Sequence, residues 1–140
     1  NRPFMKDLNG KTHTIQSVKA DHTLLIFYGP GCGHCKTEIP KIKKTLDSLI
    51  NLNYDIKTFA VATEFDVDEW KKFIKEQKTE SWINVADISH DKEGNPLASS
   101  DWRDKYDIYS TPVVYLLDKE KKIVAKRITH NQFADIITRK

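Results

Sequence analysis

The chain has 140 residues, of which 39% are hydrophobic and 31% charged, so it is long enough to fold around one core of its own. Its 23 lysines and arginines are interleaved with 20 aspartates and glutamates, which argues against a nucleic-acid-binding surface. No apolar run approaches the roughly 18 residues that a membrane span needs, and two cysteines are too few for a disulfide-stapled scaffold.

The N-terminal part predicts an arm followed by two strands. Residues 1–10 lack periodicity and are expected to form an N-terminal arm that ends in the turn dipeptide Asn9-Gly10. β-Branched residues within 12–18 predict a short edge strand. After a polar break at residues 21–23, the apolar run 24–28 predicts a central strand buried on both faces.

The next segment predicts a helix and a third strand. Apolar residues recur at helical spacing from residue 39 to residue 50, and Pro40 within them should kink the helix. Residues 51–53 end this helix, and the apolar run 56–62 predicts a strand. A strand–helix–strand connection of this length implies a right-handed parallel crossover.

The second half adds a further helix and a less regular region. Asp66 and Glu69 resemble a capping box, and the helix after them has an apolar side. Residues 82–86 predict a short strand, residues 87–95 a polar loop and residues 97–106 a short helix. We expect the whole region 80–105 to be an insertion or loop region.

The C-terminal part predicts an antiparallel hairpin and a final helix. The strands are expected at residues 113–117 and 122–128, around a turn at 118–121, and the helix at 130–139. The element order favours one α/β domain over residues 1–140, with a central mixed sheet and helices on both faces.

A pair of cysteines stands where the central strand gives way to the first helix. Cys32 and Cys35 are separated by two residues, so they can close into a small disulfide ring and reopen. Cys32 stands at the helix N-terminus, where unsatisfied N–H groups favour a thiolate, and is predicted to attack. Cys35 lies one helical turn further along the chain. It is predicted to be more buried than Cys32 and to resolve the mixed disulfide that Cys32 forms with a substrate. Gly31 and Gly33 leave room for a partner's backbone.

Two side chains beside the cysteines are candidates to tune them. His34 can carry a positive charge that stabilises a Cys32 thiolate, which would make the disulfide more oxidising than that of a CGPC protein. Glu38 follows Cys35 by one turn and could accept its proton if it is partly buried. An exposed first-turn glutamate favoured by the helix dipole is an alternative of equal weight.

The cysteine pair admits other interpretations. A zinc site needs about four ligands, but no second CxxC exists and the other histidines show no ligand spacing. Inert structural thiols and a protease-type nucleophile, which needs no second cysteine, also remain.

Thr111-Pro112 could form a cis bond, although an ordinary proline at a strand start is the more common case. Trp70, Trp82 and Trp102 fit either a core or a binding rim.

Together these features resemble the thioredoxin superfamily. The match consists of the strand, turn and CxxC, of Pro40 in the following helix, and of Thr111-Pro112 before an apolar strand. The pattern Cys-x-x-Cys-x-x-Glu-x-Pro, which runs from Cys32 to Pro40, and the long segment before Pro112 resemble the TlpA/ResA branch of bacterial envelope thiol-disulfide oxidoreductases. The resemblance implies a thioredoxin-like fold, a cis Pro112 facing the disulfide and a Glu38 that tunes the cysteines.

Three features set this sequence apart from a classical thioredoxin. Ile26 stands where that family has a buried aspartate, which favours Glu38 as the proton acceptor. Gly31 replaces the usual aromatic residue before the first cysteine. Gly33-His34 resembles the dipeptide of protein disulfide isomerases, which leaves the direction of electron flow open.

The sequence therefore predicts a protein thiol-disulfide oxidoreductase, with a reductase of envelope protein disulfides as the main hypothesis. The predicted catalytic residues are Cys32, Cys35, His34 and Glu38, and the predicted substrate-binding residues are Gly31, Gly33, Thr111 and Pro112. No metal is expected, and no cofactor beyond the Cys32–Cys35 disulfide.

The expected partners are substrate proteins and a redox-recycling partner. The resemblance implies a location outside the cytoplasm, in the bacterial periplasm or envelope, with a membrane tether outside residues 1–140. The alternative functions are a disulfide oxidase or isomerase, a thiol peroxidase, and a non-catalytic metal- or apoprotein-binding module of the same fold.

Overall fold

The architecture is a mixed β-sheet with helices packed on it, seen in a computed structural model that describes residues 5–29, 31–63, 67–86, 89–90, 96–97 and 111–139. In chain order the elements are β1 (Met5–Lys6), β2 (Thr12–His13), the 3₁₀ helix η1 (Ile15–Ser17), β3 (His22–Tyr28), α1 (Gly33–Asn51), β4 (Ile56–Ala62), α2 (Val67–Gln77), β5 (Ile83–Ala86), β6 (Ser89–His90), β7 (Pro96–Leu97), β8 (Val113–Leu117), β9 (Ile123–Lys126) and α4 (His130–Thr138). The larger sheet has the strand order β2-β1-β5-β4-β3-β8-β9, and β6 and β7 form a separate pair.

Strand β3 lies in the middle of the sheet because it pairs on both edges. It is parallel to β4 and antiparallel to β8, and β4 is parallel to β5. Every residue from Thr23 to Tyr28 is buried. This confirms the predicted central strand, which begins two residues earlier than expected because His22 already pairs with Ile56 of β4.

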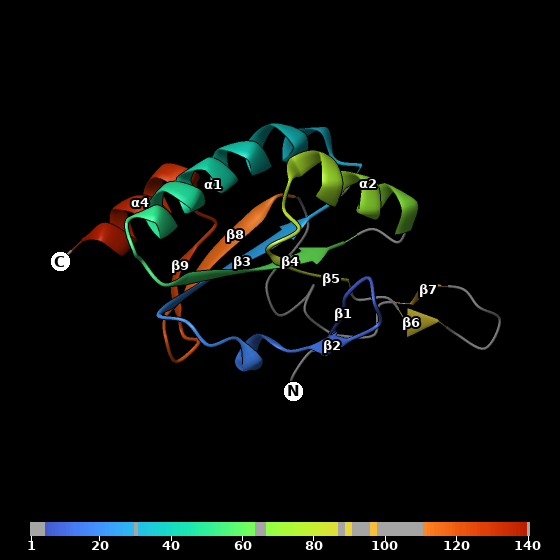
Figure 1. Cartoon of the computed structure of the whole chain (residues 1–140), viewed down its shortest axis with the longest axis horizontal. Helices are drawn as coiled ribbons and strands as arrows, with labels where there is room; N and C mark the ends of the chain where they lie inside the picture. The colour runs from blue at the N-terminus through green and yellow to red at the C-terminus, as the bar shows by residue number, and fades with distance from the viewer. Residues whose placement is uncertain are drawn as a thin grey trace.

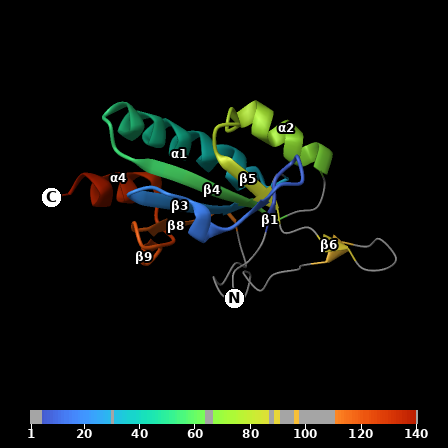
Figure 2. The same cartoon turned by 60° about the horizontal axis from the view of Figure 1, so that its bottom comes forward.

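Alternate residues of β3 contribute to two apolar layers, one on each face of the sheet. Leu24, Ile26 and Tyr28 pack in the layer beneath α1, α2 and α4, which we call the helical layer. Leu25 and Phe27 pack in the opposite layer with residues of the N-terminal arm. Figures 1 and 2 show the three α-helices on one side of the sheet and η1 on the other.

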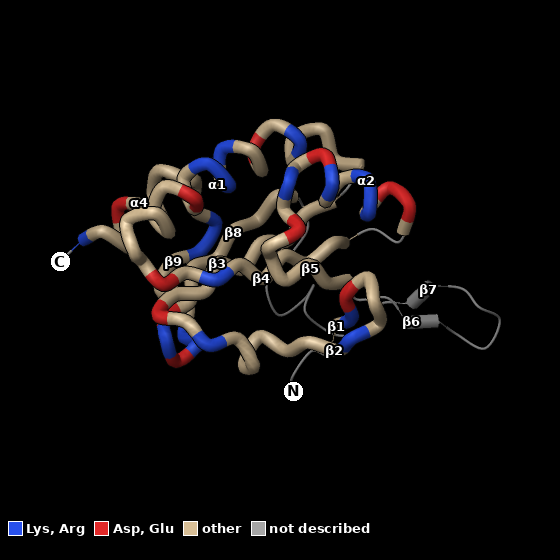
Figure 3. Tube along the Cα trace, viewed as in Figure 1, with Lys and Arg blue, Asp and Glu red and all other residues tan. Residues whose placement is uncertain are grey.

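Helix α1 brings a long apolar stripe to the helical layer. Its buried residues are Cys35, Ile39, Ile42, Leu46 and Leu49. The helix continues through Pro40, which lies on its exposed side. Basic and acidic residues are interspersed along the outer faces of α1 and α2 (Figure 3). Within the described ranges, no helix has the length and apolarity to cross a membrane.

The N-terminal arm is more ordered than its sequence predicts. Strand β1 pairs with both β2 and β5, and Gly10 completes the predicted turn with a φ of +81°. The strand predicted at residues 12–18 is wrong beyond His13. The Thr14 side chain caps η1 by accepting a hydrogen bond from the backbone N–H of Ser17 at 3.2 Å. Ile15 is buried in the apolar layer opposite the helical layer.

The region before β8 departs from the prediction in two places and is only partly described. Ser89–His90 within the predicted loop 87–95 forms β6, which pairs antiparallel with β7. Leu97, the first residue of the predicted helix 97–106, belongs to β7, and the remainder of that helix lies outside the described residues. Asp66 of the predicted capping box also lies outside them.

The C-terminal hairpin and helix agree with the prediction. β8 and β9 are antiparallel, with an irregularity between Leu116 and Leu117. Helix α4 begins with a capping box in which the Thr129 side chain accepts from the Gln132 N–H and the Gln132 side chain accepts from the Thr129 N–H. Phe133 of α4 is fully buried in the helical layer.

Candidate active site

The two cysteines lie at the junction of β3 and α1. Cys32 is the N-cap residue of α1, with φ −81° and ψ 116°, and its Sγ accepts a hydrogen bond from the backbone N–H of Cys35 at 3.1 Å. The Cys32 N–H in turn donates to the Gly29 carbonyl at 2.9 Å, which holds the turn that leads out of the strand. A sulfur in this place takes the role that a serine or aspartate oxygen plays in other helix caps, and it faces the positive end of the helix dipole.

The cysteines differ in exposure, as their spacing predicts. Both are free thiols. Cys32 is partly exposed, whereas Cys35 is fully buried in the helical layer. A partner molecule can therefore reach Cys32 and cannot reach Cys35 from solution.

Their surroundings shift the pKa values of the two thiols in opposite directions. Partial burial alone would raise the pKa of Cys32, but hydrogen bonds outweigh it and bring the pKa below that of an ordinary cysteine. The Cys35 thiol is the largest of these contributions, with further ones from Thr111 and from the backbone N–H groups of Cys35 and His34. Burial, reinforced by the neighbouring Cys32 sulfur, raises the pKa of Cys35 to about 12.

A second segment completes the surroundings of Cys32. The Cys32 thiol donates to the carbonyl oxygen of Thr111 at 3.6 Å. The Thr111–Pro112 peptide bond is cis, in agreement with what the family resemblance implies. Antiparallel pairing of β8 with β3 places Val113 opposite Phe27, so the residues before β8 arrive at the strand end that carries the dithiol.

A groove of about 190 Å³ runs from Pro112 along the start of α1. His34, Glu38 and Ile42 form one wall. The other wall contains Arg127, Ile128, Thr129 and His130, which were not predicted as site residues. The predicted hairpin is the signal that could have found them, because the Ile128 N–H donates to the Val114 carbonyl at 3.2 Å and so brings the segment after β9 beside Pro112.

The remaining predicted residues surround the same opening. The Glu38 carboxylate accepts from Lys41 Nζ at 3.3 Å and is 26% exposed, so the structure places it in the groove wall with a basic partner. The side chain of His34 is exposed. Gly31 is exposed, and a Cβ added at Gly33 would meet no atom within 4 Å. The surface over the helix start is therefore open.

The three tryptophans have different environments. Trp70 belongs to the core, where its Nε1 donates to the Tyr28 hydroxyl at 2.9 Å. Trp82 is half-buried, and Trp102 lies outside the described residues. The Tyr28 ring is stacked on Phe73 with the ring centroids 5.0 Å apart, and burial raises the pKa of Tyr28 well above its usual value.

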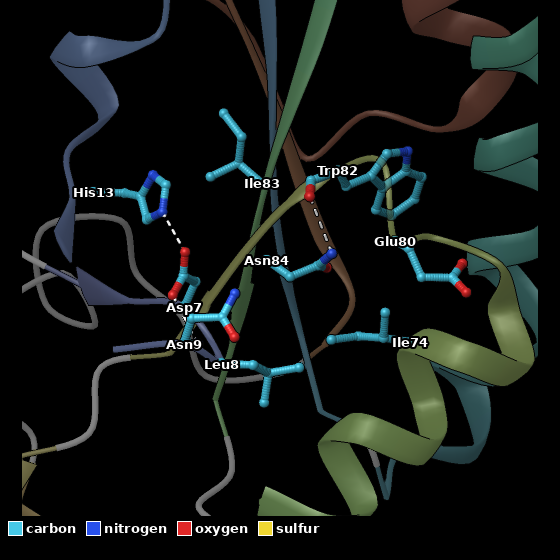
Figure 4. Close-up of a pocket in the computed structure, with 9 residues that line it drawn as sticks. All are labelled: Asp7, Leu8, Asn9, His13, Ile74, Glu80, Trp82, Ile83 and Asn84. Carbon is cyan, nitrogen blue, oxygen red and sulfur yellow. Dashed lines mark hydrogen bonds and ion pairs between the residues drawn. The ribbon is translucent and has the colours of Figure 1, made fainter. Parts of the chain in front are cut away.

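A separate hollow of about 300 Å³ lies between the β1–β2 hairpin, β5 and the end of α2 (Figure 4). His13 Nε2 lies 2.8 Å from Asp7 Oδ2 in its wall, and this hydrogen bond holds the pKa of Asp7 below its usual value. Neither cysteine lines the hollow. Over the described part of the chain, no group of three or more His, Cys, Asp or Glu side chains is arranged to hold a metal ion.

Comparison with known proteins gives a consistent result. A sequence profile of the AhpC/TSA family matches residues 4–126. A thioredoxin-like protein from Haemophilus influenzae is 25% identical over 122 residues, which are 86% of this chain and 64% of that protein. The chain thus spans less than two thirds of this curated relative.

Solved structures resemble the chain over nearly its whole length. A domain of a "possible thiol-disulfide isomerase" from Cytophaga hutchinsonii is 36% identical, with a TM-score of 0.79 over 98% of this chain and 86% of the other. The thioredoxin domain of a thiol-disulfide oxidoreductase from Bacteroides vulgatus is 26% identical, with a TM-score of 0.78 over 99% and 94% of the two chains. These similarities confirm the predicted thioredoxin-like fold.

Proposed function

This chain belongs to the AhpC/TSA family of thioredoxin-like proteins, and we propose that it catalyses thiol-disulfide exchange with protein substrates through Cys32 and Cys35. Its fold and family are those of thiol-disulfide oxidoreductases. One observation above all supports the proposal. A helix-capping thiol with a lowered pKa stands at the surface, and a buried thiol with a raised pKa lies one turn behind it.

The proposed reaction has two steps. The Cys32 thiolate attacks one sulfur of a substrate disulfide, the S–S bond breaks, and the other substrate sulfur leaves as a thiolate that takes up a proton. Cys35 then loses its proton and attacks Cys32 Sγ. The intermolecular S–S bond breaks, a Cys32–Cys35 disulfide forms, and the second substrate sulfur leaves with the bonding electron pair and becomes a thiol. Two electrons pass from the protein to the substrate.

The residues around the dithiol have distinct proposed roles. His34 stabilises the Cys32 thiolate through its positive form, and Glu38 relays the proton that Cys35 loses. The substrate chain is positioned by Thr111 and Pro112, with Gly31 and Gly33 leaving space for it. The dithiol itself carries the electrons, so the proposed reaction uses no separate cofactor.

The direction and place of the reaction are the finer part of the proposal. We assign the chain to the TlpA/ResA branch, with reduction of protein disulfides outside the cytoplasm of a bacterium as its task. A second redox protein would return the Cys32–Cys35 disulfide to the dithiol. A tether outside residues 1–140 would hold the domain at the envelope, and a fractionation experiment on the intact protein would test this location.

Trapping of a mixed disulfide tests the proposed function. The Cys35→Ala protein lacks the resolving thiol, so we expect it to accumulate disulfide-linked partners in an envelope extract that reducing agent releases. The Cys32→Ala protein is the matched control and should trap none. The absence of any Cys32-dependent adduct would favour a non-catalytic binding module. Hydrogen peroxide consumption that depends on Cys32, without protein adducts, would favour a thiol peroxidase.

A further inference from the structure

The groove that begins at Pro112 lies next to the thiol that a partner can reach. The Cys32 thiol donates to the Thr111 carbonyl at 3.6 Å, and Pro112, the next residue of the chain, lines the groove. His34, two residues after Cys32, lines it as well. Successive residues of an extended chain advance by about 3.3–3.6 Å. The residues next to a substrate cysteine that is bonded to Cys32 therefore come within reach of the groove.

Both walls of the groove are held by contacts within the fold. Arg127 has a left-handed backbone with a φ of +52°, and the Ile128 N–H donates to the Val114 carbonyl at 3.2 Å, so the connection from β9 to α4 is fixed against β8. Thr45 Oγ1 of α1 lies 3.4 Å from His130 Nδ1 of α4, which joins the two helices beside the groove. A substrate chain therefore meets walls that are already ordered, which lowers the cost of binding it.

The charged side chains of the two walls do not balance. Among the described residues that line the groove, the basic ones are His34, Arg127 and His130, and the acidic one is Glu38. The Glu38 carboxylate accepts a hydrogen bond from Lys41 Nζ at 3.3 Å. Arginine stays protonated at any physiological pH. Because Lys41 offsets the charge of Glu38, the groove presents a net positive charge to a substrate chain.

The guanidinium of Arg127 suits the recognition of a carboxylate. Arg127 is exposed. It has an interaction within the protein, which uses only some of the five N–H donors of its side chain. A guanidinium can bind a carboxylate through two parallel hydrogen bonds, whereas a lysine in the same place would meet a like charge. The groove can therefore distinguish substrate chains by the charge next to their cysteine.

We propose that Arg127 is a specificity-determining residue that selects substrate proteins with an aspartate or glutamate next to the reactive cysteine. The inference rests on the proposed dithiol exchange and names a substrate class for that site. Arg127 binds the substrate carboxylate and takes no part in the electron transfer, which remains between the Cys32–Cys35 pair and the substrate disulfide.

Three symmetrical peptide disulfides test this selection. They are identical except for the residues on both sides of the cysteine, which are glutamate, glutamine or lysine. The reduced protein passes two electrons to each: the peptide S–S bond breaks, the Cys32–Cys35 disulfide forms, and the two thiol protons of the protein end on two peptide thiols. Chromatography of the released peptide gives the second-order rate constant. Lysine makes the cysteine a better leaving group than glutamate does, so each rate is divided by that of dithiothreitol with the same peptide.

The corrected rate for the glutamate peptide should exceed that for the lysine peptide by about tenfold. In Arg127→Gln this ratio should fall to about twofold, whereas Arg127→Lys keeps the charge and should keep most of the ratio. The three side chains are unbranched, so the left-handed backbone suits them equally. Arg139→Gln is the matched control. It removes the same charge from an exposed position at the C-cap of α4, roughly 13 Å along the helix from the groove, and should keep the full ratio.

The ratio compares peptides on one protein sample, so a partly unfolded variant does not change it. A ratio near one in the unmodified protein, with all three peptides reduced, would overturn the inference and leave the dithiol exchange standing. An unchanged ratio in Arg127→Gln, or an equal fall in Arg139→Gln, would overturn it as well, because the preference would then come from another group or from net charge. If the unmodified protein reduces none of the three peptides, the proposed exchange itself is wrong.

Discussion

The thiol of Cys32 donates to the carbonyl oxygen of Thr111 at 3.6 Å, across a separation of 79 residues. The contact joins the N-terminus of α1 to the loop before β8. Because this carbonyl is a backbone group, it is positioned by the pairing of β8 with β3 and does not depend on the identity of the Thr111 side chain. We therefore expect a substrate chain that reaches Cys32 to meet the Thr111–Pro112 backbone.

The first prediction concerns the thiolate at Cys32. The Cys35 thiol lowers the pKa of Cys32, so Cys35→Ala should raise it, and half-maximal alkylation of Cys32 should move to higher pH. Cys35→Ser keeps a hydrogen-bond donor and should move the profile less. The measurement is the iodoacetamide rate against pH, and identical profiles for the two variants would contradict the role of this hydrogen bond.

The second prediction concerns His34 and the reduction potential. If the imidazolium stabilises the thiolate, the unmodified couple should lie above thioredoxin's value of about −270 mV. His34→Ala should make the potential more negative. His34→Pro should do so further, because the proline also removes the backbone N–H that favours the Cys32 thiolate. Equilibration with glutathione measures all three, and an unchanged potential in His34→Ala would show that the imidazole has no such effect.

The third prediction separates the two interpretations of Glu38. If it relays a proton from Cys35, Glu38→Gln should slow resolution of a Cys32 mixed disulfide by about tenfold or more. Lys41→Gln removes only the partner of the ion pair and should leave that rate unchanged. The free energy of unfolding of each variant should lie within about 0.5 kcal/mol of that of the unmodified protein, because the ion pair is partly exposed. If the two variants resolve the mixed disulfide at equal rates, Glu38 does not relay the proton and serves only as one partner of a surface ion pair.

The fourth prediction tests whether water reaches Ile26 in the helical layer, which also contains Cys35. Ile26→Asp places a carboxyl at a fully buried position, so its pKa in the folded protein should rise above the unfolded value of about 3.9. As the pH rises, the introduced carboxyl therefore ionises in the unfolded state before it ionises in the folded state. The free energy of unfolding should therefore fall by up to about 1.4 kcal/mol per pH unit as the pH rises from this value towards the raised folded pKa.

Urea denaturation between pH 4 and pH 7 measures this effect. Ile26→Val is the control, since it removes one buried methylene-sized group and should cost about 1 kcal/mol at every pH. A Ile26→Asp protein whose loss of stability does not depend on pH would mean that water reaches this position.

The sequence by itself determined the local features of this protein. The run that became β3, the CxxC at the start of α1, the turn at Gly10 and the β8–β9 hairpin are encoded by neighbouring residues, through apolar periodicity and turn chemistry. The exposure difference between Cys32 and Cys35 also follows from one helical turn. The error at residues 15–18 was local too, because β-branched residues suit a strand but Thr14 caps a turn of 3₁₀ helix there.

Only the tertiary structure decided which distant groups share the site. The Thr111 carbonyl, the groove wall at Arg127 and the Trp70–Tyr28 hydrogen bond, which spans 42 residues, all depend on strand order, register and helix packing. A one-residue change in register would turn Tyr28 to the opposite face of the sheet, where it could not meet Trp70. Apolar periodicity identifies a buried face but not its partners, which is why the hydrogen bond between Tyr28 and Trp70 could not be predicted from the sequence.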